Sequence, residues 1–301
     1  MKLNHTNKWP YVFIAPFFII YALFNLFPML FSFYISMTQW IGYGPMHFMG
    51  LSNYRIVFTD PSFYRSVWNS IVIVIEGMIP MQALGLILAL ALNYGFVHFG
   101  KNYVRNAFFV PYVTAPVAIG LIFAAIFDQN FGVINKFLAG AGLIRGNIDW
   151  LHTAILSKPL VAFVSLWRYL GYIAVIYLAG LQAIPAEIYE AARVDGARAP
   201  TAMIRIIIPM LKPTIVFQVT LGIIGCLRIF EEPLMLFGQG DGFSYSGGVN
   251  HSAQTMNMKY LQVAFQSGQS GYGAAVGYAM FMIILVFTMI YFWLATKKDE
   301  S

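Results

Sequence analysis

Five ionisable side chains lie inside or beside long apolar stretches of the sequence, where a charge is costly. They are Glu76, Arg168, Arg228, Glu231 and Glu232. At membrane depth each charge costs about 2.5 to 3.5 kcal/mol on insertion scales, so each one requires a partner or an aqueous cavity. The chemistry that such a set supports is the binding of a polar, hydroxyl-rich molecule by fixed donors and acceptors.

Arg228, Glu231 and Glu232 form the densest part of this set. Arg228 precedes the two glutamates by three and four residues, the spacing at which neighbours on one helix neutralise each other. One interpretation is therefore a self-paired cluster near the membrane interface. The other interpretation places Arg228 and Glu231 on a path for a polar solute.

Three aromatic residues, Trp167, Tyr169 and Tyr172, occupy what we expect to be the start of a membrane helix. Aromatic faces stack on sugar rings, which makes these residues candidates for ligand contact. Belts of Trp and Tyr at membrane interfaces have the same composition, so interfacial anchoring is the alternative.

Other chemistries find no support in the sequence. The single cysteine, Cys226, excludes an intramolecular disulfide, and the five histidines are too scattered to form a zinc site. Residues 95–101 match the first part of a phosphate-binding loop, but Asn102 replaces the required Ser or Thr. With no nucleophile beside a base and no metal-ligand set, we expect neither an enzyme nor a cofactor bound by this chain.

The composition indicates a membrane protein. Only 10% of the 301 residues are Asp, Glu, Lys or Arg, whereas 59% are hydrophobic. A soluble domain carries about a quarter charged residues, so this chain cannot cover a water-facing surface. The net charge of +6 is therefore better explained by membrane topology than by nucleic acid, which we do not expect as a partner.

Long gaps between charges predict six membrane-spanning helices, since a crossing requires about 20 mostly apolar residues. We expect an all-α integral membrane protein with a single domain over residues 1–301. The predicted spans are about 10–38, 67–93, 104–127, 159–182, 211–234 and 272–295. Prolines inside them, such as Pro111 and Pro116, indicate that some of these helices are bent.

The distribution of basic residues predicts the orientation. Short segments on one side of the membrane hold ten Lys and Arg residues, and those on the other side hold six. Loops rich in Lys and Arg stay in the cytoplasm, so we expect both termini to be cytoplasmic. The first apolar stretch is longer than the core of a signal peptide, which favours an anchor that is retained.

The main polar loop, residues 185–209, lies on the cytoplasmic side between the fourth and fifth spans. Pro185 suits a first helical position and Gly196 suits a left-handed helix end, so we expect two short helices joined by a sharp turn. Its alanine-rich face fits a groove of another protein, where Glu190 and Asp195 would meet cationic groups. An amphipathic helix held by lipid is the alternative.

This loop resembles the EAA motif of the membrane subunits of bacterial binding-protein-dependent ABC importers. The matching residues are Glu190, Ala191, Ala192, Asp195, Gly196, Ala197 and the later Pro209. Shorter similarities extend along most of the chain, among them Gly271-Tyr272-Gly273-Ala274-Ala275 before the last span. Together they are similar to the carbohydrate-importing branch, which includes the membrane subunits of the maltose transporter.

The resemblance implies a permease subunit that forms half of the path for a sugar or oligosaccharide in the bacterial cytoplasmic (inner) membrane. It implies that residues 185–209 form the coupling helix, which docks onto a separate ATP-binding subunit. That subunit would be present in two copies and would hold the ATP and Mg²⁺. The other implied partners are a second, related six-span permease, an extracytoplasmic substrate-binding protein and membrane lipid.

Three points stay open at the level of sequence. The alternative function is an ion-coupled secondary transporter of a small polar solute, for which Glu76 alone would have to serve as the ion site. The substrate is also open: Arg228 on the path would favour an anionic sugar such as a uronate, but two acids stand beside it. The third point is the structure of the loop at residues 238–257.

Overall fold

A computed structural model describes residues 9–93, 101–238 and 244–297 of the protein. Within these ranges the regular secondary structure is helical apart from one two-stranded sheet, in agreement with the predicted all-α class. Contacts divide the chain into two compact units, residues 1–60 with 260–279 and residues 61–259 with 280–301. Most of the phosphate-loop-like segment and residues 239–243 of the 238–257 loop lie outside the described residues.

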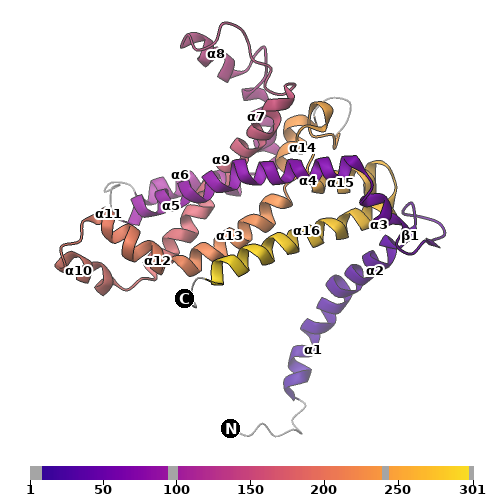
Figure 1. Cartoon of the computed structure of the whole chain (residues 1–301), viewed down its shortest axis with the longest axis horizontal. Coiled ribbons are helices and arrows are strands. Elements are labelled where there is room, and N and C mark those ends of the chain that lie inside the picture. Colours follow the sequence, from indigo (N-terminus) through magenta and orange to yellow (C-terminus); the bar gives the residue numbers. More distant parts are fainter. Residues whose placement is uncertain (1–8, 94–100, 239–243, 298–301) are drawn as a thin grey trace. The chain divides into compact units, whose positions relative to one another are not determined.

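The first unit contains the N-terminal span. α1 (Trp9–Tyr21), the π-helical turn η1 (Ala22–Leu26) and α2 (Phe27–Ser36) follow one another without interruption (Figure 1). These 28 residues are long and apolar enough to cross a membrane, and they lie where the sequence predicts a span at 10–38.

A short hairpin follows this span. β1 (Thr38–Gln39) pairs with β2 (His47–Phe48) in antiparallel register, and α3 (Ser52–Val57) comes next. The buried Asn53 side chain of α3 donates a hydrogen bond to the backbone oxygen of Ser36 at 3.0 Å. The amide thereby satisfies a carbonyl at the end of the preceding helix, which has no partner within that helix.

The first unit is completed by the π-helical turn η5 (Gln262–Gln266) and the beginning of α16 (Ser270–Thr296). Gly273 lies so close to this turn that an added Cβ would come within 2.6 Å of the Ala264 Cβ. The small residue therefore permits close packing between α16 and the turn that precedes it.

The second unit contains the other long helices, each long and apolar enough to cross a membrane. They are α4 (Pro61–Ile73) continued through η2 (Val74–Met78) into α5 (Ile79–Asn93), α9 (Ala154–Gln182), α13 (Lys212–Leu227) followed by α14 (Glu231–Phe237), and the greater part of α16. They lie where the sequence predicts spans at 67–93, 159–182, 211–234 and 272–295.

The third predicted span is not a straight helix. It consists of α6 (Lys101–Val113) and α7 (Pro116–Ile126), which meet at an angle of 97°. The cause is local: Pro116 disfavours a helical conformation at Ala115, which takes φ −56° and ψ 128° instead. The described chain thus has five candidate spans, or six if the bent pair is counted as one.

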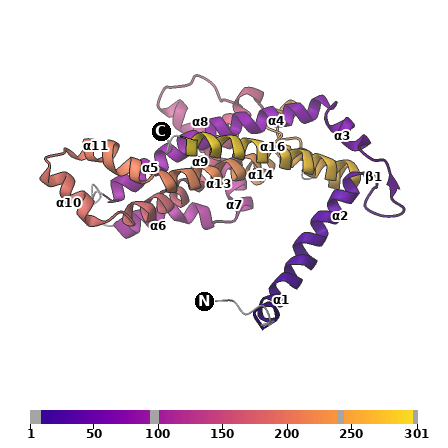
Figure 2. The ribbon, with the colours of Figure 1, turned by 60° about the horizontal axis from the view of Figure 1, so that its bottom comes forward.

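α9 is the central helix of the second unit and packs against α4, α5, α6 and α13 (Figures 1 and 2). Glycine makes the closest of these contacts possible. At Gly171 an added Cβ would overlap the backbone carbonyl of Phe108 in α6. At Gly85, on α5, it would come within 2.6 Å of the Ile173 side chain. Small residues on both sides of α9 therefore set the spacing of the bundle.

The polar loop between α9 and α13 forms several short helical segments. They are α10 (Ala186–Val194), α11 (Ala199–Ala202), the π-helical turn η3 (Met203–Ile207) and α12 (Ile208–Met210). Gly196 takes a φ of +71° between α10 and α11, the left-handed conformation that the sequence predicts there. Pro185 occupies the N-cap position, just before the first residue of α10, whereas the sequence predicts it at the first helical position.

Two further loops of the second unit are held by polar side chains. The loop with α8 (Val133–Gly140) follows Asp128, whose carboxylate accepts backbone N–H groups of Phe131 and Asn130, and these bonds lower its pKa. The loop with η4 (Val249–His251) leads into α15 (Met256–Leu261). Many of its backbone groups are satisfied by side chains of α4 and α9, which fixes it against the long helices.

We predict that Gly171→Ala lowers the free energy of unfolding by about 1 to 3 kcal/mol, because the methyl group would push α6 away from α9. Gly225→Ala is the matched control: that glycine also lies within a helix, but nothing lies within 4 Å of its added Cβ. Thermal unfolding of the detergent-purified protein measures both. Equal melting temperatures for the two variants would show that α6 and α9 do not approach each other this closely.

Candidate functional site

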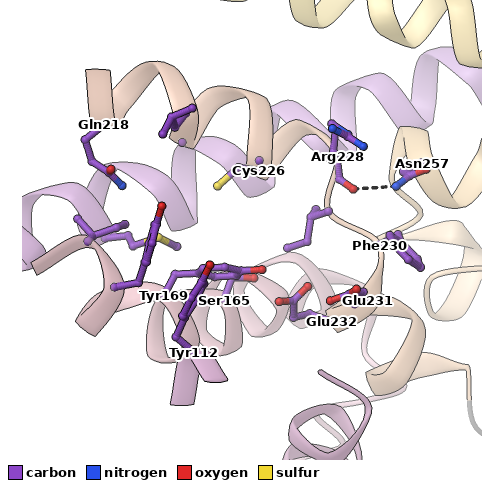
Figure 3. Close-up of a pocket in the computed structure, with 17 residues that line it drawn as sticks. Tyr112, Ser165, Tyr169, Gln218, Cys226, Arg228, Phe230, Glu231, Glu232 and Asn257 are labelled. Carbon is purple, nitrogen blue, oxygen red and sulfur yellow. Dashed lines mark hydrogen bonds between the residues drawn. The ribbon is translucent and has the colours of Figure 1, made fainter. Parts of the chain in front are cut away.

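A cavity of about 430 Å³ lies in the second unit, beside the end of α13. Side chains of α5, α6, α9, α13, α14 and α15 line it (Figure 3). Its lining residues are Met81, Tyr112, Ser165, Tyr169, Tyr172, Ile173, Gln218, Leu221, Gly222, Gly225, Cys226, Arg228, Ile229, Phe230, Glu231, Glu232 and Asn257. The cavity therefore brings together the two predicted tyrosines of α9 and the predicted charged residues near position 230.

The cavity exists because the fifth span is interrupted. α13 ends at Leu227, and helical structure resumes only at Glu231 in α14. The Asn257 amide donates to the Arg228 backbone oxygen at 2.8 Å, and the Thr255 hydroxyl donates to the Ile229 backbone oxygen at 2.7 Å. Non-helical backbone at membrane depth is tolerated only where protein or a water-filled cavity satisfies it, and these two bonds meet part of that requirement.

A buried ionic cluster joins α9 to the start of α14. The Nη1 atom of Arg168 lies 2.7 Å from a carboxylate oxygen of Glu232 and 3.1 Å from one of Glu231. The side chains of Arg168 and Glu232 are only 8% and 2% exposed, whereas that of Glu231 is 40% exposed. Arg168 therefore neutralises the deeply buried glutamate, and Glu231 keeps one side open to the cavity.

Of the two interpretations of Arg228, Glu231 and Glu232, the self-paired cluster is wrong. It assumed one continuous helix, but α13 ends at Leu227, so residues three and four positions apart no longer share a helical face. Among the described residues, the ion pairs of both glutamates are with Arg168. Figure 3 shows the exposed Arg228 guanidinium on the far side of its own backbone from the two glutamates.

Tyrosine rings form one wall of the cavity. Tyr112 stacks on Tyr172 with the ring centroids 4.4 Å apart and the planes 18° apart, and it meets Tyr169 edge-on at 5.8 Å. The Arg168 guanidinium carbon lies 5.0 Å from the centroid of the Tyr169 ring. Tyr169 and Tyr172 lie in the middle of α9 rather than at its start, which corrects the position expected from the sequence.

Trp167 does not line the cavity. Its ring packs edge-on against Phe123 of α7, with the centroids 5.1 Å apart. A helix presents successive residues on different faces, so Trp167 points away from the wall that Tyr169 and Tyr172 share. This residue contributes to packing between α7 and α9.

Tyr112 and Gln218 are among the lining residues that sequence reasoning missed. Gln218 is 2% exposed, its Oε1 atom has no hydrogen-bond partner, and Figure 3 shows its amide directed toward the space that Tyr169 also faces. The available signal was an isolated amide in an otherwise apolar span. Tyr112 follows Pro111 in the bent third span, and nothing in the sequence separates it from its aromatic neighbours.

The residues predicted in the polar loop lie at a different site, on α10 and the turn after it, with Pro209 farther along on α12. Among them Ala192 is buried and Ala197 is partly buried. The exposed ones are Glu190, Ala191, Asp195, Gly196 and Pro209. Val194, beside them, is 87% exposed, so this surface combines carboxylates with an uncovered apolar group.

One tyrosine connects this loop to the long helices. The Tyr189 hydroxyl of α10 donates to the Leu181 backbone oxygen near the end of α9 at 3.1 Å. The Asn93 amide at the end of α5 donates to the same hydroxyl at 3.3 Å. α10 is thereby attached to two of the helices whose side chains line the cavity.

No group of three or more His, Cys, Asp or Glu side chains in the described part of the chain is arranged to hold a metal ion.

Comparison with known proteins identifies relatives along most of the chain. The family model for "binding-protein-dependent transport system inner membrane component" matches residues 81–299. The arabinooligosaccharides transport system permease protein AraP of Bacillus subtilis (strain 168) is 33% identical over 286 residues, which cover 93% of this chain and 86% of AraP. The lactose transport system permease protein LacF of Rhizobium radiobacter is 31% identical over 294 residues, which cover 97% of this chain and 95% of LacF.

A solved structure has the same fold. It is a bacterial ABC transporter described as importing the acidic polysaccharide alginate, and one of its chains matches with a TM-score of 0.81 at 20% identity. The match covers 96% of each of the two chains.

We predict that Arg168→Met lowers the free energy of unfolding by about 3 to 5 kcal/mol, because it leaves the Glu232 carboxylate buried without its partner. The double variant Arg168→Met with Glu232→Gln removes the unpaired charge and should recover a large part of that loss. Thermal unfolding of the two variants and of Glu232→Gln alone checks this. Equal losses in the single Arg168→Met variant and the double variant would show that the pair does not carry the cost.

Proposed function

The chain belongs to the family of binding-protein-dependent transport system inner membrane components, and we propose that it forms half of the path by which an ATP-driven importer takes up a sugar or oligosaccharide. AraP and LacF, which match more than nine-tenths of the chain, are named as permeases for arabinooligosaccharides and lactose. The observation that carries the proposal is the cavity beside the helix break, because it combines aromatic faces with polar groups between candidate spans.

The cavity lining suits a sugar ring. The stacked pair of Tyr112 and Tyr172 offers a flat apolar platform, and such faces pack against the C–H groups of a sugar. Glu231 and Gln218 offer oxygen atoms to its hydroxyl groups. A sugar that leaves bulk water can therefore exchange hydration for fixed partners.

The polar loop is proposed to dock onto the ATP-binding subunit. Glu190, Asp195 and Val194 form an exposed surface on α10 and the following turn, where carboxylates surround an apolar group. A helix with this pattern fits a groove with cationic walls. ATP and Mg²⁺ would be held by two copies of that subunit, and this chain supplies only the docking element.

Movement at the loop can reach the cavity through α9. ATP binding would draw the two ATP-binding subunits together and displace α10 with them. Tyr189 would pass this displacement to the end of α9 and to the end of α5. Because α9 continues for 29 residues and carries Arg168, Tyr169 and Tyr172, its tilt would change the cavity wall and shift the path between inward-open and outward-open states.

The remaining partners follow from the proposed half-path. A second, related permease would supply the other half. An extracytoplasmic binding protein would deliver the sugar, and a related alginate transporter has been solved with a periplasmic protein that holds an alginate pentasaccharide. The protein is a multi-pass membrane protein, and we infer that both of its termini are cytoplasmic in the inner membrane.

Purification from native membranes tests the proposed function. We expect an ATP-binding subunit, a second six-span protein and a substrate-binding protein to accompany this chain, and the ligand of the binding protein would identify the sugar. The alternative, an ion-coupled transporter that acts alone, finds no support among the relatives. It would gain support if the purified chain, free of any ATPase, took up solute along an ion gradient.

We predict that Glu190→Lys weakens docking of the ATP-binding subunit by about tenfold or more, since it reverses a charge at the centre of the proposed interface. The variant should still insert into the membrane. Asp149→Lys is the control, because it makes the same change of charge in the loop that follows α8. Co-purification of the ATPase and sugar uptake are the measurements, and an unchanged yield of the ATPase with Glu190→Lys would contradict the docking assignment.

A further inference from the structure

The charged group that the cavity presents to a ligand is a carboxylate. Glu231 lines it with a carboxylate that is 40% exposed. Arg168 is shared with the buried Glu232, so the three side chains together carry one net negative charge. A ligand that enters the cavity from solvent therefore meets the open side of a carboxylate.

A second acceptor points to a ligand independently of this charge. Gln218 lines the same cavity and is 2% exposed, yet its Oε1 oxygen has no hydrogen-bond partner. A buried oxygen without a donor costs about 1 to 3 kcal/mol, so the position is favourable only when a donor arrives. A sugar hydroxyl supplies such a donor, whereas a carboxylate group would bring another acceptor.

The cations near the cavity are not turned toward a ligand. Arg168 is 8% exposed, its Nη1 atom is held by both glutamates, and neither this atom nor its unpaired Nε belongs to the cavity lining. Arg228 lines the cavity, but Figure 3 shows its guanidinium turned away from the glutamates, beyond its own backbone. The other titratable groups of the lining are Tyr112, Tyr169, Tyr172 and Cys226, which are neutral in their protonated forms.

We propose that this cavity selects uncharged, hydroxyl-rich saccharides and excludes saccharides that carry carboxylates. The selection rests on the proposed function and adds a substrate class to it. An acidic sugar would place its carboxylate beside Glu231 with no cation turned toward it, and repulsion between like charges is strong where water is scarce. In this property the chain would differ from the structurally similar transporter whose substrate is the acidic polysaccharide alginate.

The single cysteine of the chain makes this charge measurable, because Cys226 lines the cavity. The complete transporter in native membranes, without ATP, is treated with a cationic or an anionic methanethiosulfonate reagent. The ratio of the two rates at Cys226 is divided by the ratio for a free small thiol in the same buffer. This quotient cancels the reactivity of the thiol and reports the local electric potential.

We expect the cationic reagent to react faster at Cys226, so that the quotient exceeds one. Glu231→Gln should lower the quotient by roughly tenfold, since it removes one charge close to the thiol. Glu76→Gln is the matched control: it makes the same change in η2, outside the cavity lining, and should leave the quotient unchanged. A quotient at or below one in the wild type would overturn the proposal, as would equal effects of the two variants.

A second thiol position is used in case Cys226 reacts too slowly to measure. The double variant Leu221→Cys with Cys226→Ser places the only thiol of the chain at residue 221, which is 40% exposed and lines the same cavity, and the same quotient is measured. The measurement needs neither uptake nor ATP hydrolysis. If the potential is negative but the chain has no partner subunits, the proposed function is contradicted and the proposed selectivity is not. If the potential is positive in an intact importer, the proposed selectivity is contradicted and the proposed function is not.

Discussion

A positive charge buried in the middle of α9 constrains the helices around it. Arg168 is almost fully enclosed, and an unpaired charge in such surroundings costs several kcal/mol. Its partners, Glu231 and Glu232, are the first two residues of α14, so they reach Arg168 only if the preceding helix stops before them. The ionic cluster and the break at residues 228–230 therefore require each other, and the cavity is the space that the break leaves.

α9 connects the two sites of the protein. Its middle carries the arginine and the tyrosines of the cavity, and its last turn accepts a hydrogen bond from the polar loop. Glycines hold its neighbours at close range, so a tilt of α9 cannot be absorbed by loose packing and must move α5 and α6 as well. This arrangement gives a physical route by which events at α10 can change the cavity without a contact between the two sites.

The sequence predicts the spans well because long apolar runs between charges are a strong local signal. It also predicts the left-handed turn at Gly196, since few other residues tolerate that conformation. The sequence does not predict which charged groups pair with each other. Arg168 and Glu231 are 63 residues apart, and only the packing of α9 against α14 brings them together. The interpretation that pairs Arg228 with the two glutamates fails because its spacing assumes a continuous helix. The prolines predict bent helices, but the sequence does not give the 97° angle at Pro116.

The measurement that tests this account most directly is the access to Cys226 from each side of the membrane in the intact transporter. A thiol reagent that cannot cross the bilayer is applied to sealed vesicles of either orientation, with no nucleotide or with a non-hydrolysable ATP analogue. The account predicts that Cys226 reacts from the cytoplasmic side without nucleotide and from the opposite side once the ATP-bound state is trapped. Access from the same side in both states would contradict the claim that this cavity is part of a path driven by a partner ATPase.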